Sequence, residues 1–132
     1  MPITYSTTDI PAADEVANLL RAGGFNRPLD DLTRVERMLR NADVIVTARD
    51  GDTLVGIVRG LADYAVYALV TELAVAAPYK RMGIGRELLR RFREEASEEC
   101  TIILHSSEEG HAFYGHIGWD NIDRTWRLPR SR

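Results

Sequence analysis

The segment Leu73–Leu89 reads LAVAAPYKRMGIGRELL, and it decides the fold prediction. Its apolar start ends at Ala77-Pro78, which predicts a strand that stops at a short loop. Apolar residues at helical spacing follow Gly83-Ile84-Gly85, which predicts a helix that begins at the glycines. The first N–H groups of a helix have no acceptor within the helix, and glycines allow an anion to approach the backbone closely. The segment therefore predicts an anion site between a strand and a helix.

Charges along this predicted helix, residues 83–97, run against the usual order. Helices favour acidic side chains in their first turn and basic ones in their last. Here Lys80, Arg81 and Arg86 cluster at the start. The far end is acidic and carries Glu94, Glu95, Glu98 and Glu99. A bound polyanion at the helix start would remove the unfavourable charge there, whereas the later arginines are expected to form i,i+4 pairs such as Glu87–Arg91 and Arg90–Glu94.

The remaining periodicities predict one α/β (α+β) domain over residues 1–132. Two helices are expected first, at residues 11–22 and 30–41, with Asp30 as the N-cap of the second. Three antiparallel strands should follow, at residues 43–49, 53–61 and 64–75, with Asp50-Gly51 as the first turn. After the helix at 83–97 we expect a short buried strand at 101–104, a short helix near 111–116 and a final strand or hairpin through Trp119 and Trp126. The strand–helix–strand unit requires parallel pairing, so the sheet should be mixed but mostly antiparallel.

Composition excludes several classes of protein. The chain has 132 residues, 45% of them apolar and 28% charged, which is ordinary for a soluble globular domain. No apolar run approaches the roughly 20 residues that span a bilayer, and the start lacks a signal peptide pattern, so we expect a cytoplasmic protein without a membrane partner. The single cysteine, Cys100, excludes an intrachain disulfide and a multi-cysteine metal site, and no metal is expected. A net charge of −3 argues against nucleic acid as a partner.

Two common phosphate-binding motifs do not fit the glycine segment. A dinucleotide-binding fingerprint requires a third glycine where the chain has Leu88, and a P-loop requires a Gly-Lys-Ser/Thr triplet that the sequence lacks. Dinucleotides and nucleoside triphosphates are therefore disfavoured as the anion.

Two motifs resemble those of the GNAT superfamily of acetyl-CoA-dependent N-acetyltransferases. The stretch Lys80–Gly85 resembles the family's motif A, Arg/Gln-x-x-Gly-x-Gly/Ala, although a lysine stands in its first position. A lysine can act as a point charge toward phosphate but not as a bidentate partner. The stretch Ala112–Trp119, AFYGHIGW, is similar to the family's C-terminal Phe-Tyr-x-x-x-Gly-Phe signature. The resemblance implies the GNAT fold, a twisted sheet with two N-terminal helices, a long motif A helix and a short C-terminal helix, in a small single-domain bacterial member.

The resemblance also implies where acetyl-CoA would bind. Backbone N–H groups from Arg81 to Arg86 would hold the pyrophosphate, with the charges of Lys80 and Arg81 nearby. The N–H of Leu73 would polarise the thioester carbonyl, an oxyanion-type contribution of roughly 3 kcal/mol per donor, and Val75 would pair with the pantetheine amides. The cofactor-binding residues implied in this way are Leu73, Ala74, Val75, Lys80, Arg81, Met82, Gly83, Ile84, Gly85, Arg86 and Ser107.

Two side chains are the candidates for the chemistry. Tyr114 matches the family's general acid, which would protonate the departing thiolate; the alternative is a buried structural tyrosine. Glu72 interrupts an apolar strand, and a desolvated carboxylate there could have a raised pKa suited to a general base. The alternatives are that Glu72 is an exposed strand glutamate or forms a salt bridge with an arginine, and that His105 or a water relay takes the proton.

The acceptor would be a small-molecule amine or a protein amine, and the sequence does not name it. An aminoglycoside, a polyamine and a protein N-terminus all stay open, as does a homodimer. The fold implies that the acceptor site is lined by the loop Phe25–Arg27 and by Tyr64, Tyr67 and Trp119. Two other functions compete: a non-catalytic acyl-CoA-binding or regulatory module, and an interaction domain that holds a different phosphate.

Overall fold

A computed structural model describes residues 2–108 and 110–132 of the chain. Its five-stranded sheet has the strands in sequence order, and only the last neighbour pair, β4 with β5, is parallel. The mixed, mostly antiparallel sheet that the sequence predicts is therefore confirmed. The strands are β1 (Thr4–Ser6), β2 (Val44–Asp50), β3 (Thr53–Ala62), β4 (Tyr67–Val75) and β5 (Thr101–Leu104).

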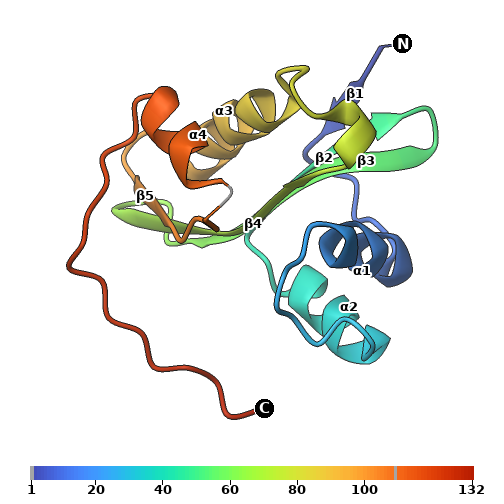
Figure 1. The fold of residues 1–132 in the computed structure, drawn as a ribbon, viewed down its shortest axis with the longest axis horizontal. Helices are drawn as coiled ribbons and strands as arrows, with labels where there is room; N and C mark the ends of the chain where they lie inside the picture. The colour runs from blue at the N-terminus through green and yellow to red at the C-terminus, as the bar shows by residue number, and fades with distance from the viewer. Residues whose placement is uncertain (1, 109) are drawn as a thin grey trace.

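The helices cover both faces of this sheet, as Figure 1 shows. On one face, α3 packs with its buried side chains around Phe92 and Leu88, and the short α4 lies beside it. On the other face, α1 and α2 form a second core around Leu20 and Val35. The bounds of the helices are α1 (Ala13–Ala22), α2 (Leu32–Arg40), the 3-10 turn η1 (Ala77–Tyr79), α3 (Ile84–Ala96) and α4 (His111–His116).

Some predicted boundaries were wrong for local reasons. The N-cap of α2 is Asp31 and not Asp30, because the Asp31 carboxylate accepts a hydrogen bond from the Arg34 N–H at 3.1 Å. The third predicted strand begins at Tyr67 and not at Tyr64. The Asp63 carboxylate accepts N–H bonds from residues 65–67, which fixes a turn in which Tyr64 has a φ of +64°.

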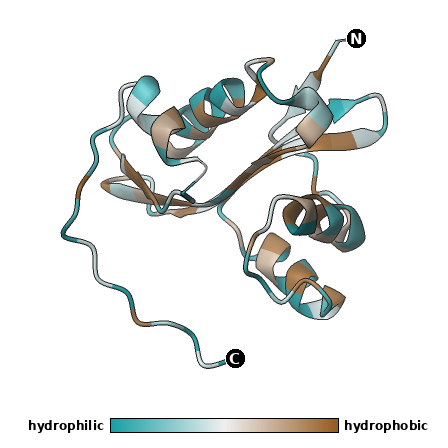
Figure 2. Cartoon of the chain, viewed as in Figure 1, coloured by the Kyte–Doolittle hydropathy of each residue, from teal (hydrophilic) through white to brown (hydrophobic). Residues whose placement is uncertain are grey.

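The predicted last strand was also wrong, and a first strand was missed. Residues 119–132 contain no regular secondary structure. Trp119 still packs against the α3 core, but further along the tail Trp126 is 94% exposed and Leu128 is 96% exposed. Figure 2 shows that this tail is mostly hydrophilic, in contrast to the central strands. The missed strand, β1, is only three residues long. The predicted strand at 101–104 is present, but it lies at the sheet edge and is only partly buried.

A β-bulge in β4 changes which face its side chains point to. Arg59 on β3 pairs with Glu72, but the next residue, Gly60, pairs with Val70, so Thr71 is an extra residue in β4. Before the bulge, Ala68 and Val70 belong to the α3 core. After it, Glu72 and Ala74 point toward the α1–α2 face, while Leu73 and Val75 pack against the α3 core.

Gly60 lets α3 approach the sheet closely. A Cβ at this position would lie 2.3 Å from the Leu69 carbonyl oxygen and 2.5 Å from the Phe92 ring. Phe92 is completely buried, so it has no room to withdraw. Among the described residues, no helix is both long and apolar enough to cross a membrane.

Candidate active site

The loop before α3 turns its backbone in an unusual way. Arg81 has a φ of +66°, which is rare for a residue with a side chain, and Gly83, the N-cap of α3, has a φ of +82°. The Glu87 N–H donates to the Gly83 carbonyl at 3.0 Å, so the N–H groups of residues 84–86 precede the first helical acceptor. Such non-glycine backbone strain is retained where the surrounding structure requires it, commonly at ligand sites. A backbone of this shape, with N–H groups ahead of the first helical acceptor, is one that can hold an anion.

The neighbouring edge of β4 leaves backbone donors unpaired with the sheet. The Ala76 N–H donates to the Val55 carbonyl on β3 at 2.8 Å. Because N–H directions alternate along an extended chain, the N–H groups of Leu73 and Val75 point to the opposite edge. The pairing of β5 with β4 ends at Val70 and Leu104, before it reaches them.

Gly85 brings the helix start and this strand edge together. A Cβ built on Gly85 would lie 3.8 Å from Val75, 3.9 Å from Leu73 and 3.8 Å from the ring of Phe113 on α4. The helix start, the free edge of β4 and α4 therefore surround one region. Within this set, Ile84 is buried in the core and Ala74 in the opposite core, so they can contribute only backbone atoms, while Lys80, Arg81, Met82 and Arg86 are exposed.

Tyr114 lies on α4 in an aromatic cluster beside this region. Its ring is 5.2 Å from that of Phe113 and 5.6 Å from that of Trp119, and its carbonyl accepts the Trp119 N–H at 2.9 Å. Burial raises the pKa of the Tyr114 hydroxyl, so the group stays protonated at neutral pH. No hydrogen bond joins this hydroxyl to any other residue within 2–108 or 110–132. The side chain is available as a proton donor.

Ser107 stabilises the turn that leads into α4. Its hydroxyl oxygen accepts a hydrogen bond from the Gly110 N–H at 3.0 Å, and a Cβ on Gly110 would lie 3.8 Å from the Tyr114 ring. The structure thus brings Ser107 near Tyr114 but engages its side chain in a local turn.

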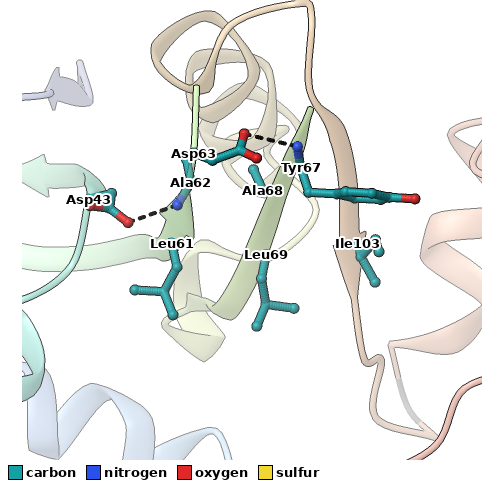
Figure 3. A pocket seen from close by; sticks show the side chains of 8 residues that line it. All are labelled: Asp43, Leu61, Ala62, Asp63, Tyr67, Ala68, Leu69 and Ile103. Atoms are coloured by element: carbon teal, nitrogen blue, oxygen red, sulfur yellow. Dashed lines mark hydrogen bonds between the residues drawn. The ribbon is translucent and has the colours of Figure 1, made fainter. Parts of the chain in front are cut away.

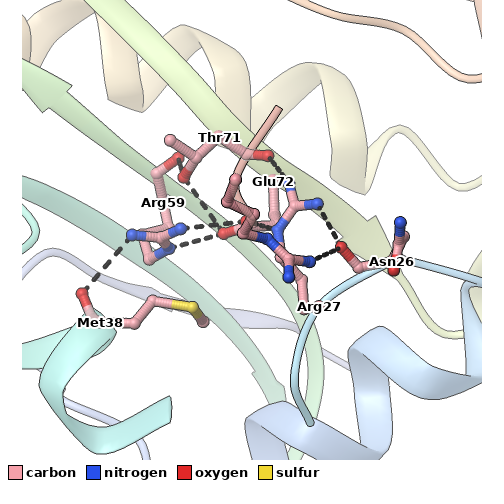
Figure 4. Close-up of polar contacts among 7 residues, drawn as sticks. Asn26, Arg27, Met38, Arg59, Thr71 and Glu72 are labelled. Carbon is pink, nitrogen blue, oxygen red and sulfur yellow. Dashed lines mark hydrogen bonds and ion pairs between the residues drawn. The ribbon is translucent and has the colours of Figure 1, made fainter. Parts of the chain in front are cut away.

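Glu72 lies in a buried ion cluster, as Figure 4 shows. It is 2% exposed, and Arg59 on β3 binds both of its carboxylate oxygens, at 2.5 and 3.0 Å. Arg27, from the loop between α1 and α2, donates from Nε to Glu72 at 2.6 Å and from Nη2 to the Thr71 carbonyl at 2.9 Å. Of the interpretations that the sequence left open, the structure contains the salt bridge to an arginine and contradicts the exposed strand glutamate.

The expectation of a raised pKa at Glu72 was wrong. Burial does raise the pKa of this carboxyl, but the hydrogen bonds and charges of Arg59 and Arg27 outweigh burial and hold the pKa below its ordinary value. A carboxylate with both oxygens bound to guanidinium groups is a weak proton acceptor at neutral pH. Sequence reasoning missed Arg59, although a signal existed: Arg59 interrupts an apolar strand just as Glu72 does, and two such interruptions of opposite charge predict a cross-strand pair.

The predicted acceptor residues are not all brought together. Phe25 and Arg27 share one loop, where the guanidinium carbon lies 5.8 Å from the Phe25 ring centroid. Tyr67 begins β4, about six residues and 20 Å along the strand from Leu73. Tyr64 lies in the adjoining turn, and its hydroxyl donates to the Asp43 carbonyl at 3.0 Å. Both tyrosines are therefore distant from the free edge of β4.

An open cavity of about 490 Å³ lies at this end of the sheet (Figure 3). Its floor is apolar, and the partly exposed side chains of Leu61, Leu69 and Ile103 contribute to it. Asp43 and Asp63 stand at the rim, and their carboxylates accept hydrogen bonds from the Ala62 and Tyr67 N–H groups. Tyr67 is the only predicted acceptor residue that lines this cavity among the residues that the structure describes.

The remaining predictions concern charge, histidine and metal. The pairs Glu87–Arg91 and Arg90–Glu94 are present, so the later arginines of α3 are engaged with acids of their own helix. His105 is exposed and follows β5 directly. Across residues 2–108 and 110–132, no three side chains of the metal-binding types cluster closely enough to hold an ion.

Several solved structures share this architecture. An acetyltransferase of the GNAT family from Streptococcus pneumoniae is 27% identical, with 99% of each chain covered and a TM-score of 0.81. A Staphylococcus aureus protein, described as a probable acetyltransferase of unknown function, is 18% identical, with 99% of this chain and 100% of that chain covered and a TM-score of 0.84. AAC(6')-Iy, solved with a CoA-based bisubstrate analogue, is 10% identical over the full length of both chains, with a TM-score of 0.74.

No curated protein matches the chain. The family described as the acetyltransferase (GNAT) domain matches residues 24–127, which include the free edge of β4, the start of α3 and Tyr114. The match spans most of the chain and agrees with the fold and with the two motifs read from the sequence. The chain therefore belongs to the GNAT acetyltransferase family.

Proposed function

We propose that the protein transfers an acetyl group from acetyl-CoA to a primary amine by direct attack in a ternary complex. The observation that carries the proposal is the meeting of three features at Gly85: the donor-rich start of α3, the free edge of β4 and the aromatic cluster of α4. The first suits a pyrophosphate, and the second suits the amides and thioester of a pantetheine arm. The CoA-based analogue bound by AAC(6')-Iy supports acetyl-CoA as the donor.

The chemistry follows from these positions. The amine nitrogen attacks the thioester carbonyl carbon, and the Leu73 N–H stabilises the negative charge that grows on the oxygen. The carbon–sulfur bond then breaks, and the Tyr114 hydroxyl donates its proton to the leaving thiolate. Burial supports this assignment because it raises the pKa of Tyr114 and keeps the proton on the hydroxyl.

The proton of the attacking amine goes to water in this proposal. Glu72 is disfavoured as the base because Arg59 and Arg27 bind its carboxylate and lower its pKa. His105 is disfavoured because it lies exposed beyond β5, and no residue in 2–108 or 110–132 forms a hydrogen bond that would orient its ring. The gap beyond Val70 and Leu104, where β5 leaves β4, provides the path by which solvent would reach the amine.

Titration calorimetry with acetyl-CoA, followed by thiol release across a panel of amines, tests the proposal. We expect binding that weakens when Arg81 or Arg86 is replaced by glutamine, because each removes a positive charge at the helix start. Arg93→Gln is the matched control, since it removes the same charge near the other end of α3. Absence of binding at millimolar acetyl-CoA would sink the proposal, and tight binding without thiol release would favour an acyl-CoA-binding module instead.

A further inference from the structure

The ion cluster around Glu72 holds more positive than negative charge. One carboxylate faces two guanidinium groups, and Arg59 alone already binds both carboxylate oxygens. Arg27 is the second cation on the same acid, at 2.6 Å. No other acidic side chain in the described part of the chain pairs with Arg59 or Arg27. The cluster therefore carries a net positive charge next to the bulge of β4.

Arg27 also retains hydrogen-bonding capacity. A guanidinium has five N–H donors. Those of Arg27 reach three acceptors: Glu72, the Thr71 carbonyl and the Asn26 carbonyl. Its side chain is 31% exposed, whereas that of Arg59 is 11% exposed. Arg27 thus presents unused donors and an uncompensated charge to solvent, whereas Arg59 binds the buried carboxylate of Glu72 from within the core.

The position of Arg27 relates it to the reacting atoms. It binds the carbonyl of Thr71, two residues before Leu73. In the proposed reaction the Leu73 N–H donates a hydrogen bond to the thioester carbonyl oxygen. The pairing of β4 with β5 has already ended at Val70 and Leu104. Arg27 therefore stands on the α1–α2 face of the sheet, at the opening that leads to the edge where acetyl-CoA would lie.

An apolar floor lies on the same face of the sheet, further along β4 toward its start. Because Thr71 is an extra residue, Leu69 and Glu72 are consecutive side chains on this face of β4. Leu69 is 36% exposed and pairs with Ile103 on β5, and both line the open cavity of about 490 Å³. A ligand at Arg27 would thus have an apolar surface within about two strand positions, or roughly 7 Å.

From this juxtaposition we infer that the acceptor carries a carboxylate close to its amine and has an apolar body, as an apolar α-amino acid does. Arg27 binds the carboxylate, the floor around Leu69 and Ile103 takes the apolar part, and the amine reaches through the opening toward the thioester. A polyamine or an aminoglycoside would place further positive charge against the net positive cluster, which is unfavourable. The inference rests on the proposed function because it names the acceptor class of that reaction.

The experiment uses two pairs of amines that differ only by the carboxylate: phenylalanine with phenethylamine, and leucine with isoamylamine. We expect kcat/KM to be about 10- to 100-fold higher for the amino acids, the range given by a hydrogen-bonded charge contact of about 1.5–3 kcal/mol. Arg27→Gln should reduce this ratio to about one without weakening acetyl-CoA binding. Arg27→Lys, which keeps the charge without the fork, should retain part of the preference.

Arg40→Gln is the matched control, because it removes an exposed arginine of α2 whose ion pair among the described residues is with Glu36. It should leave the ratio unchanged. Equal rates for the two members of each pair in the wild-type protein, or an equal loss for both in Arg27→Gln, overturn the inference. To separate this from failure of the proposed function, the Arg27 Nε–H signal is followed by NMR in the CoA-loaded protein: a shift with phenylalanine but not phenethylamine supports the carboxylate site even without turnover, and no shift overturns it.

Discussion

Tyr114 combines a proton donor with an aromatic anchor, and the two can be separated by one substitution. Tyr114→Phe keeps the ring between Phe113 and Trp119 but removes the hydroxyl. We expect kcat to fall about 10- to 100-fold, less than the usual effect of losing a general acid, because a thiolate with a pKa near 8.5 is a good leaving group. Acetyl-CoA affinity should not change. Thiol-release kinetics with calorimetry measure both, and Tyr5→Phe on β1 serves as the control.

Glu72→Gln distinguishes a structural acid from a general base. The substitution leaves the buried charge of Arg59 without its partner, so we expect the free energy of unfolding to fall by about 3–5 kcal/mol. Urea denaturation measures this loss, and Glu36→Gln, in an exposed pair on α2, should barely move the midpoint. The opposite pattern, full stability with loss of the acidic limb of the pH–rate profile, would restore Glu72 as the base.

Helices and strands were predictable where several features of the local sequence indicated the same structure. The helix α3 and the loop before it followed from glycines, apolar spacing and charge, and so did its ion pairs. The bulge at Thr71 was not predictable from the sequence pattern. Every second residue from Ala68 to Ala74 is buried, as in a regular strand, although the buried side chains before and after the bulge point to opposite faces of the sheet. The tail has the apolar residues of a strand, but it pairs with none of the described strands, and its printed contacts are hydrogen bonds such as that from Arg130 to the Asn26 carbonyl. The orientation of the Leu73 N–H depends on pairing partners, which spacing alone does not contain.

The contact between β3 and α3 predicts a large effect from one methyl group. Gly60→Ala would press a Cβ against the Leu69 carbonyl and the Phe92 ring, so we expect a loss of about 3 kcal/mol in the free energy of unfolding. Gly115→Ala, in α4, has open space around its Cβ and should stabilise that helix by about 0.5–1 kcal/mol. Denaturant midpoints of the two variants compare them; a tolerated alanine at position 60 would contradict the close approach.

At the scale of the whole molecule, Arg49 connects the N-terminal segment, α1 and the sheet. It binds Asp9 at 2.7 Å and Glu15 at 2.8 Å. Hydrogen bonds from Arg49 hold the pKa of both carboxyls below their ordinary values. A carboxyl whose pKa is lower in the folded state stabilises the protein above its unfolded pKa of about 4, and that contribution is lost as the pH falls through the folded value.

Stability should therefore decrease below about pH 5, and Glu72, whose pKa is also lowered, contributes with the same sign. Urea midpoints from pH 7 to pH 3 measure the decrease. In Arg49→Met the decrease should be smaller, since Asp9 and Glu15 lose the partner that shifts them. An unchanged pH dependence in that variant would show that the acid sensitivity arises elsewhere.

The bulge at Thr71 also affects how the molecule unfolds. The first half of β4 contributes Ala68 and Val70 to the core under α3, and the second half contributes Ala74 to the core under α1 and α2. A strand that belongs to both cores cannot leave one without disturbing the other. The two halves of the domain should thus open together, and native-state hydrogen exchange should show the amides of α1 and α3 sharing one unfolding free energy.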